Sequence, residues 1–455
     1  MSEGVLQDGP VVTVVGGGLA GSEAAWQAAR MGARVRLYEM RPARPTPVHQ
    51  TGLLAELVCS NSLGGAGTDT SAGLLKEEMR RLGSLVVQAA DAHRVPAGSA
   101  LAVDRERFAS EITRKVEAHP SITVIREEVR EVPEPGDGVV VLATGPLTSD
   151  ALAASLARLV GDRFLAFYDA AAPIVTAESI DTDRGFWASR HGKGTPDYLN
   201  LPMDREQYEA LSQALAEADV HEGHLPEELK FFEGCVPVEE LARRGLDTLR
   251  YGPMRPVGLR DPRTGQMPYA VVQLRKEDAE GRLLNLVGFQ TRLKWGEQAR
   301  IFRMIPGLEQ AEFVRFGVVH RNTFVNAPRV LEPTGQVKGH GRLLLAGLIT
   351  GVEGYVESAA AGWLAGVNAA RILRGLSPMV LPPETMMGAL WRYVTTARPD
   401  DFQPMNAAFG LLPPAGRARS RQERRARQAE RALQAVDRVA EEVERWVAEL
   451  GAVAP

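Results

Sequence analysis

A glycine-rich turn between an apolar strand and a helix constrains the fold of this chain more than any other feature. The run Val11–Val15 is apolar, the glycines at 16, 18 and 21 fit the pattern G-x-G-x-x-G, and a helical run, Ser22–Met31, follows. A second strand, Val35–Met40, completes a β-α-β unit, the context in which this pattern predicts a dinucleotide site. A glycine-rich turn without a ligand is the weaker interpretation.

There is a physical reason for glycine at each of the three motif positions. Gly16 permits the tight turn, Gly18 lets the backbone approach a pyrophosphate on the helix N-terminus, and Gly21 allows the helix to pack on the sheet. Glu39 ends the second strand, where a carboxylate can hydrogen-bond to an adenosine ribose. The predicted cofactor-binding residues of this part are Gly16, Gly17, Gly18, Leu19, Ala20, Gly21, Glu39 and Arg41.

Two later segments indicate which dinucleotide binds. Val139–Gly145 is an apolar strand, and Arg342–Gly347 is another, followed by a glycine-rich turn and a helix of small residues, Tyr355–Leu373. FAD needs such a distant segment to close over its ribityl chain and present a helix N-terminus to the flavin ring, whereas NAD does not. We therefore favour FAD over NAD. The added cofactor-binding residues are Ala143, Thr144, Gly145, Gly347, Thr350, Gly351 and Val352. Common flavoproteins carry an aspartate here, and the role of the nearest acid, Glu353, stays open.

The middle of the chain changes to short strands, prolines and loops, with predicted strands at Ala172–Glu178, Val257–Arg260 and Tyr269–Arg275. The pattern predicts an α/β fold, a Rossmann-like FAD-binding domain with an inserted α+β domain. The FAD-binding domain takes residues 1–170 and 321–455, and the inserted domain takes 171–320. Such an insertion usually places a substrate cleft where the domains meet.

The end of the chain reads as a proline-rich passage, 378–414, followed by a long helix. Apolar residues recur there at three- and four-residue steps, which predicts one buried helix face. They are Leu433, Val436, Ala440, Val443, Val447 and Leu450.

Composition excludes several classes of protein. The 455 residues carry 53 Lys and Arg against 57 Asp and Glu, a net charge of −4, with 44% hydrophobic residues. A disordered chain and a wholly basic nucleic-acid binder are therefore excluded. Two cysteines are too few for a disulfide scaffold or structural zinc, and we predict no metal. The sequence lacks membrane and targeting signals, so we expect a cytoplasmic protein.

The two cysteines lie in different contexts. Cys59 lies where an apolar run passes into a Ser/Asn/Gly loop, which can turn several N–H groups toward one thiolate. Cys235 lies between Gly234 and Pro237, which imply a fixed turn. Taken alone, each cysteine is more often a buried, inert residue.

Basic residues form three local clusters despite the acidic total. A solvated helix face explains such clusters, and so does a localised RNA footprint, because phosphate contacts are made by a patch. Trp295 suits stacking on a planar ligand or packing in the core. The clusters are Arg292, Lys294, Arg300 and Arg303; then Arg315, His320 and Arg321; and Arg417, Arg419, Arg421, Arg424, Arg425, Arg427 and Arg431.

Ten segments between residue 11 and about residue 414 match one family: VVGGGLAGSEAAW, ELVCSNSLGG, LKEEMRRLGSL, FEGCVPVEELARRG, YGPMRPVGL, YAVVQLRKED, NLVGFQTRLKWGEQ, HRNTF, GLITGVEGYVESAAAG and FQPMNAAFGLLPP. The glycine motif is common to many flavoproteins, whereas the two cysteine segments, LKWGEQ and FQPMNAAFGLLPP are specific. Together they resemble the folate- and FAD-dependent tRNA (uracil-5-)-methyltransferases, the TrmFO family. The resemblance implies methylation of the T-loop uridine (position 54) of tRNA at C5, giving ribothymidine. The carbon would come from 5,10-methylenetetrahydrofolate, and the hydride from FAD reduced by NAD(P)H.

The resemblance also implies roles for single residues. Cys235 would add to uracil C6, because the resulting enolate can attack an electrophilic methylene. Cys59 would be a second catalytic thiol near the flavin, and these two roles could be reversed. Arg292, Lys294 and Trp295 would hold the anionic, aromatic folate, with His320 and Tyr355 as further substrate-binding candidates.

The expected partners are folate and the T arm of tRNA, without DNA or a membrane, and the oligomeric state stays open. One alternative is a flavoprotein like the larger MnmG/GidA proteins, which modify the wobble uridine of tRNA. A flavin oxidoreductase acting on a small molecule, or a flavin-bound RNA-binding protein without catalysis, would also fit parts of the pattern.

Overall fold

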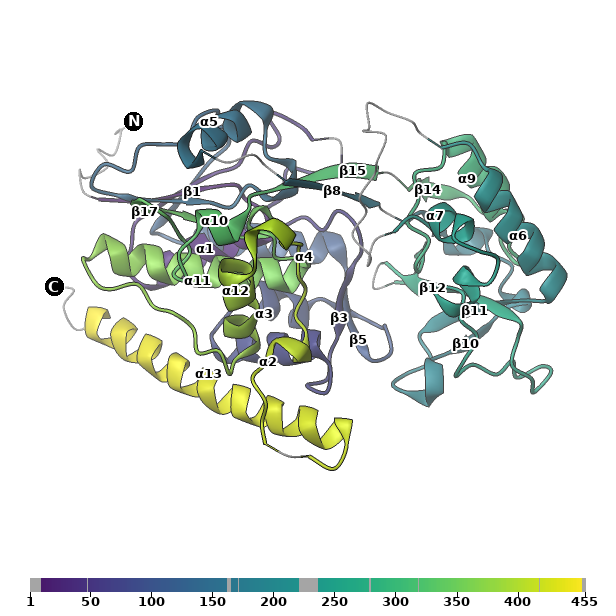
Figure 1. Cartoon of the computed structure of the whole chain (residues 1–455). Coiled ribbons are helices and arrows are strands. Elements are labelled where there is room, and N and C mark those ends of the chain that lie inside the picture. The colour runs from purple at the N-terminus through teal and green to yellow at the C-terminus, as the bar shows by residue number, and fades with distance from the viewer. Residues whose placement is uncertain are drawn as a thin grey trace.

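The computed structural model describes residues 10–46, 48–161, 165–170, 172–220, 236–277, 280–317, 319–416 and 418–451. These residues form two lobes, shown side by side in Figure 1. The larger lobe holds the first and last parts of the chain, and the smaller lobe holds the middle. A two-stranded antiparallel ribbon of β8 (Leu165–Ala170) and β15 (Val319–Phe324) runs between them.

The larger lobe is built on a six-stranded sheet. Its order is β16-β17-β7-β1-β2-β6, parallel throughout except for β16 at one edge. The apolar runs form these strands because helices cover both faces of a parallel sheet. The strands are β1 (Val12–Val15), β2 (Val35–Tyr38), β6 (Ile122–Ile125), β7 (Val139–Leu142), β16 (Gln336–Val337) and β17 (His340–Leu345).

Two helices cross closely against this sheet, α1 (Leu19–Arg30) and α11 (Tyr355–Leu373). A Cβ atom at Gly362 would lie 2.2 Å from the carbonyl oxygen of Ala20, and one at Gly366 would lie 2.4 Å from that of Ala24. Only glycine permits this approach at either position. The predicted helix of small residues, with the same bounds, is confirmed.

Buried glutamates cap two further helices of this lobe. Glu23 accepts hydrogen bonds from the N–H groups that open α3 (Leu85–Ala92). Glu78 accepts them from Met386 and Met387 at the start of α12 (Met386–Thr396). A carboxylate suits a helix N-terminus because unpaired N–H groups and the helix dipole meet there. The helices are α2 (Ser71–Arg81), α3 (Leu85–Ala92), α4 (Arg105–Ala118), α5 (Asp150–Val160), α10 (Ala327–Val330) and α12 (Met386–Thr396).

The chain ends in a long helix, α13 (Arg421–Gly451), which lies along the lower side of the larger lobe in Figure 1. Its predicted apolar face packs into the core, where Val436 and Val443 are buried. The side-chain amide of Gln428 donates to the carbonyl oxygens of Phe409 and Leu412. The helix thereby holds segment 402–412, part of the passage expected only to be proline-rich, against the lobe.

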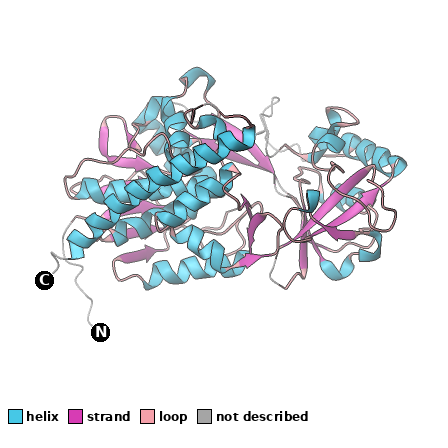
Figure 2. Cartoon of the chain, turned by 90° about the horizontal axis from the view of Figure 1, so that it is seen from below, coloured by secondary structure: helices cyan, strands magenta, loops and turns pink. Residues whose placement is uncertain are grey.

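The smaller lobe has an antiparallel sheet and a hydrophobic core of its own. Figure 2 shows the strands gathered there, while helices dominate the larger lobe. The sheet order is β10-β11-β12-β13-β9-β14. The elements are β9 (Ile174–Thr176), β10 (Phe186–Ala188), β11 (Tyr198–Met203), α6 (Arg205–Glu217), α7 (Val238–Arg243), α8 (Thr248–Tyr251), β12 (Ala270–Lys276), β13 (Leu283–Leu286), α9 (Trp295–Phe302) and β14 (Phe313–Arg315).

A third sheet, β3 (Ser62–Gly65), β5 (Ala100–Val103) and β4 (Arg94–Val95), lies in the larger lobe. The expected Rossmann-like fold with an inserted α+β domain is confirmed. The boundaries at residues 170 and 320 stay a prediction.

The expected strand Val257–Arg260 is wrong. Leu259 N donates to Pro256 O, which makes this segment a turn, and Gly258 adopts φ +86° beside the ring of His191. A left-handed residue cannot continue a strand. Of the helices that the structure describes, none is both long and apolar enough to cross a membrane.

Candidate active site

A cavity of 640 Å³ opens at the carboxyl ends of β1, β2 and β7. Ligands of parallel α/β sheets bind at this edge, and the volume lies within the usual range for cofactor sites, about 300–1,000 Å³. The glycine turn, the residues at the end of β2 and the segment that follows β7, all assigned to FAD from the sequence, meet in its wall. The predicted residues that line it are Gly16, Gly18, Leu19, Ala20, Glu39, Arg41, Cys59, Ala143, Thr144, Gly145 and Tyr355.

The glycine turn forms one end of this cavity. Gly16 has φ +102°, and a Cβ atom there would lie 2.5 Å from the carbonyl oxygen of Ala143. A Cβ at Gly21 would lie 1.7 Å from the carbonyl oxygen of Gly16, so helix α1 could not approach the turn. A Cβ at Gly18 would meet no protein atom within 4 Å. The open space at Gly18 suits a bound group that the backbone approaches closely.

Glu39 is tied to the same turn. Its carboxylate accepts the N–H of Gly17 at 2.9 Å and Nε of Arg41 at 2.9 Å, and Glu56 receives Nη1 of Arg41 at 3.1 Å. Burial alone would raise the pKa of Glu39, but the hydrogen bonds and charge of Arg41 bring that pKa below its usual value. The carboxylate therefore stays ionised at neutral pH, as a ribose acceptor requires.

The second predicted FAD segment does not line the cavity itself, and its residues pack against the residues around it. Gly347, Thr350, Gly351 and Val352 are not among the lining residues. Gly347 and Gly351 have positive φ, and a Cβ at either would lie less than 3 Å from Ala20 or Phe402. Their neighbours Glu353 and Gly354, together with the first turn of α11, line the cavity instead.

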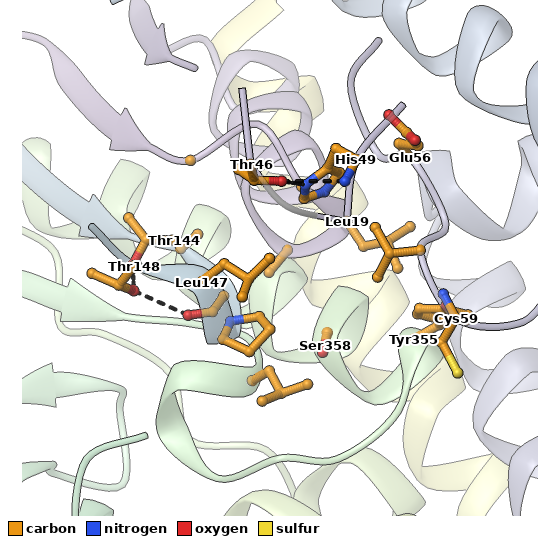
Figure 3. A pocket seen from close by; sticks show the side chains of 18 of the residues that line it. Leu19, Thr46, His49, Glu56, Cys59, Thr144, Leu147, Thr148, Tyr355 and Ser358 are labelled. Carbon is orange, nitrogen blue, oxygen red and sulfur yellow. Dashed lines mark hydrogen bonds between the residues drawn. The ribbon is translucent and has the colours of Figure 1, made fainter. Parts of the chain in front are cut away.

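A second part of the cavity wall, here called the thiol end, carries Cys59. Its backbone N–H donates to the hydroxyl oxygen of Tyr355 at 2.7 Å, and the N–H of Ser60 donates to the same oxygen at 3.1 Å. Figure 3 shows Cys59 beside Tyr355, with Thr144, Leu147 and Thr148 across the cavity. Burial raises the pKa of Tyr355, so its hydroxyl keeps its proton. The N–H groups of the Ser/Asn/Gly loop therefore do converge on one point, but that point is a neutral tyrosine hydroxyl and not the thiolate or anionic group that the sequence suggested.

Other candidate residues lie apart from the cavity, in the smaller lobe. The backbone N–H of Arg292 donates to Glu239 at 2.8 Å, and Lys294 pairs with Asp219 at 3.3 Å. Trp295 is 59% exposed and stacks on Phe316, with 5.8 Å between ring centroids. None of these three lines the cavity.

Of two further candidates, the structure describes the backbone position of one and does not describe the other. His320 lies in β15, opposite Asp169 of β8. Cys235 lies outside the described residues, as does Arg417 of the last basic cluster. In that cluster, Arg427 pairs with Glu423, and Arg431 donates to the carbonyl oxygen of Pro414, so both are engaged within the chain.

Several lining residues were not predicted from the sequence. Thr46, His49 and Thr148 come from loops with no recognisable motif, whereas Asn406 lies in the segment FQPMNAAFGLLPP, to which the sequence assigned no site residue. Lys76 lies fully buried near the cavity and donates Nζ to the carbonyl oxygen of Leu63 at 2.6 Å. Burial lowers the pKa of Lys76 to about 8, and the nearby carboxylate of Glu357 opposes that effect. Among the described residues, no group of three or more His, Cys, Asp or Glu side chains could hold a metal ion.

The family model described as glucose inhibited division protein A matches residues 11–377. The chain belongs to the GidA family. Curated relatives refine this placement. The methylenetetrahydrofolate–tRNA-(uracil-5-)-methyltransferase TrmFO of Symbiobacterium thermophilum is 61% identical over 429 residues, covering 93% of this chain and 96% of that relative. The TrmFO of Moorella thermoacetica is 61% identical over 424 residues, covering 93% and 97%.

The resemblance of this GidA-family chain to the TrmFO proteins is therefore confirmed. Among solved structures, Aquifex aeolicus GidA in its form II crystal superposes with a TM-score of 0.71. The match covers 98% of this chain and 77% of that one, at 19% identity. At that identity the likeness shows the fold alone.

Proposed function

We propose that the chain methylates C5 of the T-loop uridine (position 54) of tRNA, using 5,10-methylenetetrahydrofolate and FAD that NAD(P)H reduces. The near-full-length match to methyltransferases of that name carries the proposal. The cavity supports it, because a thiol and a dinucleotide turn line the same wall.

The chain's own residues fit FAD. Gly16, Gly18 and the N-terminus of α1 would hold the pyrophosphate, Glu39 the ribose, and Thr144 with the first turn of α11 the flavin. The open space at Gly18 is the observation that favours a bound group there. When bound and reduced, FAD supplies the hydride that completes the methyl group.

The thiols would act on the substrates. The Cys235 thiolate adds to uracil C6, and the C5 enolate that results forms a bond to the methylene carbon of folate. The bond from the methylene carbon to folate N10 breaks as the new bond to C5 forms. A base then removes the C5 proton, and the bond to folate N5 breaks, so that tetrahydrofolate leaves and a methylene group remains on C5. A hydride from the reductant adds to this methylene, and the C6–S bond breaks to return the thiolate. Cys59, at the cavity wall, accepts a proton or carries the methylene, and exchange of roles between the two thiols remains part of the proposal.

Other residues would bind the substrates, three of them in the smaller lobe, His320 in β15 and Tyr355 in α11. Arg292, Lys294 and Trp295 are proposed to hold folate, with His320 and Tyr355 at the substrate. The exposed face of Trp295 suits stacking on an aromatic ligand. Unchanged binding of a folate analogue to Trp295→Ala would contradict this part.

The test is a methylation assay with the full chain, FAD, NADPH, tRNA and folate labelled in the methylene carbon. We expect label in ribothymidine of the T arm, and loss of incorporation in Cys235→Ala and in the chain stripped of FAD. A tRNA transcript with cytidine in place of the target uridine is the control.

Other outcomes would replace the proposal. Label in the anticodon arm would favour wobble-uridine modification. Oxidation of NADPH at the same rate without tRNA and folate would favour a small-molecule oxidoreductase. An active Cys235→Ala protein would contradict the assigned thiol.

A further inference from the structure

The loop that carries Cys59, residues 57–61, is held by three arginines from both lobes. Arg105, the first residue of α4 in the larger lobe, donates Nη1 to the carbonyl oxygen of Leu57 at 2.8 Å. It also donates Nη2 to that of Cys59 at 3.1 Å. From the smaller lobe, Arg315 at the end of β14 donates to the carbonyl oxygen of Val58. Arginines from both lobes therefore bind three consecutive carbonyl groups of the loop, up to that of Cys59 itself.

The end of β12 completes this arrangement. Arg275 donates Nη2 to Oγ of Ser60 at 2.8 Å and Nε to Oδ1 of Asn61 at 3.1 Å. The side-chain amide of Asn61 donates to the carbonyl oxygen of Lys276 at 2.9 Å. The smaller lobe therefore reaches the loop through two neighbouring residues of one strand.

Glu277 supplies the negative charge of the cluster. Its Oε2 pairs with Nε of Arg105 at 2.6 Å, and the residue is 4% exposed. Within the part of the chain that the structure describes, Oε1 of Glu277 has no hydrogen-bond partner. The loop thus meets three guanidinium groups and one carboxylate, an excess of positive charge.

Positive charge crowded in a partly buried place is costly unless an anion compensates it. Burial lowers the pKa of Arg315, and the like charge of Arg105 lowers that pKa further. Tyr355 and Cys59 act in the opposite direction on Arg315. A thiolate at Cys59 would therefore relieve the repulsion between the arginines.

We propose that Arg105, Arg275 and Arg315 form a clamp that holds Cys59 as the thiolate and couples its ionisation to the seating of the smaller lobe. The three arginines are positioning residues, since they contact the loop and act through Cys59. The clamp deepens the proposed function, because it assigns a charge environment to one of its two thiols. Among the residues that the structure describes, the charged or titratable groups that face the loop are Arg105, Arg275, Glu277, Arg315 and Tyr355.

The test measures the rate at which iodoacetamide alkylates Cys59 across a pH series in the full chain, with mass spectrometry of the Cys59 peptide. This readout separates Cys59 from Cys235. In Arg315→Gln the pH of half-maximal alkylation rises by about one unit, because a nearby opposite charge lowers such a midpoint by about one to three units. In Arg315→Lys, which keeps the charge, the midpoint stays near the wild-type value.

Glu277→Gln should shift the alkylation midpoint in the opposite direction. Removing the one carboxylate strengthens the positive field, so the alkylation midpoint falls. Misfolding cannot produce shifts in opposite directions, and Glu277→Gln decides the matter alone if Arg315→Gln does not fold. Arg205→Gln is the matched control, since Arg205 pairs with Glu209 on the exposed surface of α6.

Unchanged midpoints in both variants, or shifts of the same sign, would overturn the clamp. Alkylation needs neither tRNA nor folate, so this result stands apart from the methylation assay. If the chain methylates tRNA but the alkylation midpoints do not change in the variants, the clamp is wrong and the proposed function stands.

Discussion

The two ends of the cavity are built in different ways. At the dinucleotide end, one continuous turn, Gly16–Gly21, sets the shape through backbone geometry, and Glu39 follows within the same β-α-β unit. At the thiol end, the loop of Cys59 depends on side chains from α4, α11, β12 and β14. One end is thus determined locally and the other by tertiary contacts across both lobes.

This difference sets what each end tolerates. At the dinucleotide end, the space around each Cα atom decides whether the turn can form. At the thiol end, hydrogen bonds and charges decide where the thiol lies and how readily it ionises. We therefore expect steric clashes with the backbone to decide the effect of substitutions at the dinucleotide end. At the thiol end, the loss of hydrogen bonds or charges should decide it.

The largest effect is expected from Gly21→Ala. Its Cβ would lie 1.7 Å from the carbonyl oxygen of Gly16, a backbone atom that cannot move aside cheaply. Helix α1 must shift, at a cost of about 1–3 kcal/mol, which would weaken FAD binding by about fivefold to more than a hundredfold. Flavin absorbance per mole of purified protein measures the loss.

Gly296→Ala is the control for this substitution, because a Cβ there meets no atom within 4 Å. It should retain flavin as the wild type does. Gly18→Ala should keep its melting temperature and still lose flavin affinity, since its Cβ enters open space at the cavity. A Gly21→Ala protein that retains as much flavin as the wild type would contradict this explanation of the dinucleotide end.

A smaller effect is expected at the thiol end from Tyr355→Phe. The change leaves the N–H groups of Cys59 and Ser60 without their acceptor. An unsatisfied donor away from water costs about 1–3 kcal/mol, so amide exchange at these partly buried residues should quicken about fivefold or more. Hydrogen–deuterium exchange of the peptide that contains Cys59 measures it.

Tyr393→Phe serves as the matched control, because its hydroxyl donates to Gln403 in an exposed place. Exchange near Cys59 should not change in that variant. If Tyr355→Phe also leaves the exchange unchanged, the tyrosine does not hold the loop.

The smallest effects concern pH and stability. The pKa of Glu39 lies below its usual 4.5, so this carboxylate stabilises the fold above about pH 4.5 and loses that effect as pH falls through its folded value. The melting-temperature advantage of wild type over Glu39→Gln should therefore be full near pH 7 and shrink in acid.

The pH dependence of stability expected from Glu78 is opposite to that expected from Glu39. Burial raises its pKa to about 8, so the folded state favours the protonated form. Its contribution to stability is full below about pH 4.5 and declines as pH rises toward 8. Scanning calorimetry of Glu78→Gln should show the wild-type advantage falling with rising pH. The same pH trend in both variants would contradict these assignments.

The sequence predicted the parts whose cause is local. The strands of the β-α-β unit and helix α11 follow from apolar runs and small residues, and they were found with little error. Helix α12 was missed inside a proline-rich passage, although Thr385 caps it and Glu78, distant in sequence, accepts from its first N–H groups. At Val257–Arg260 an apolar pattern was outweighed by a proline and a left-handed glycine.

The candidate site divides in the same way. The glycine turn and Glu39 could be read from spacing, because the motif lies within one unit. Cys59 could be singled out, but its partners could not. Arg315 was assigned to a basic cluster with His320 and Arg321, and only the fold brings it to the carbonyl oxygen of Val58.

The most direct test of the central claim uses folate whose methylene group carries deuterium in place of both hydrogens. The complete chain, with FAD and NADPH, should give T-loop ribothymidine whose methyl group holds both deuterium atoms and one hydrogen from the reductant. Mass spectrometry of the isolated nucleoside reads this pattern. A methyl group without deuterium, obtained only when S-adenosylmethionine is added, would contradict the account.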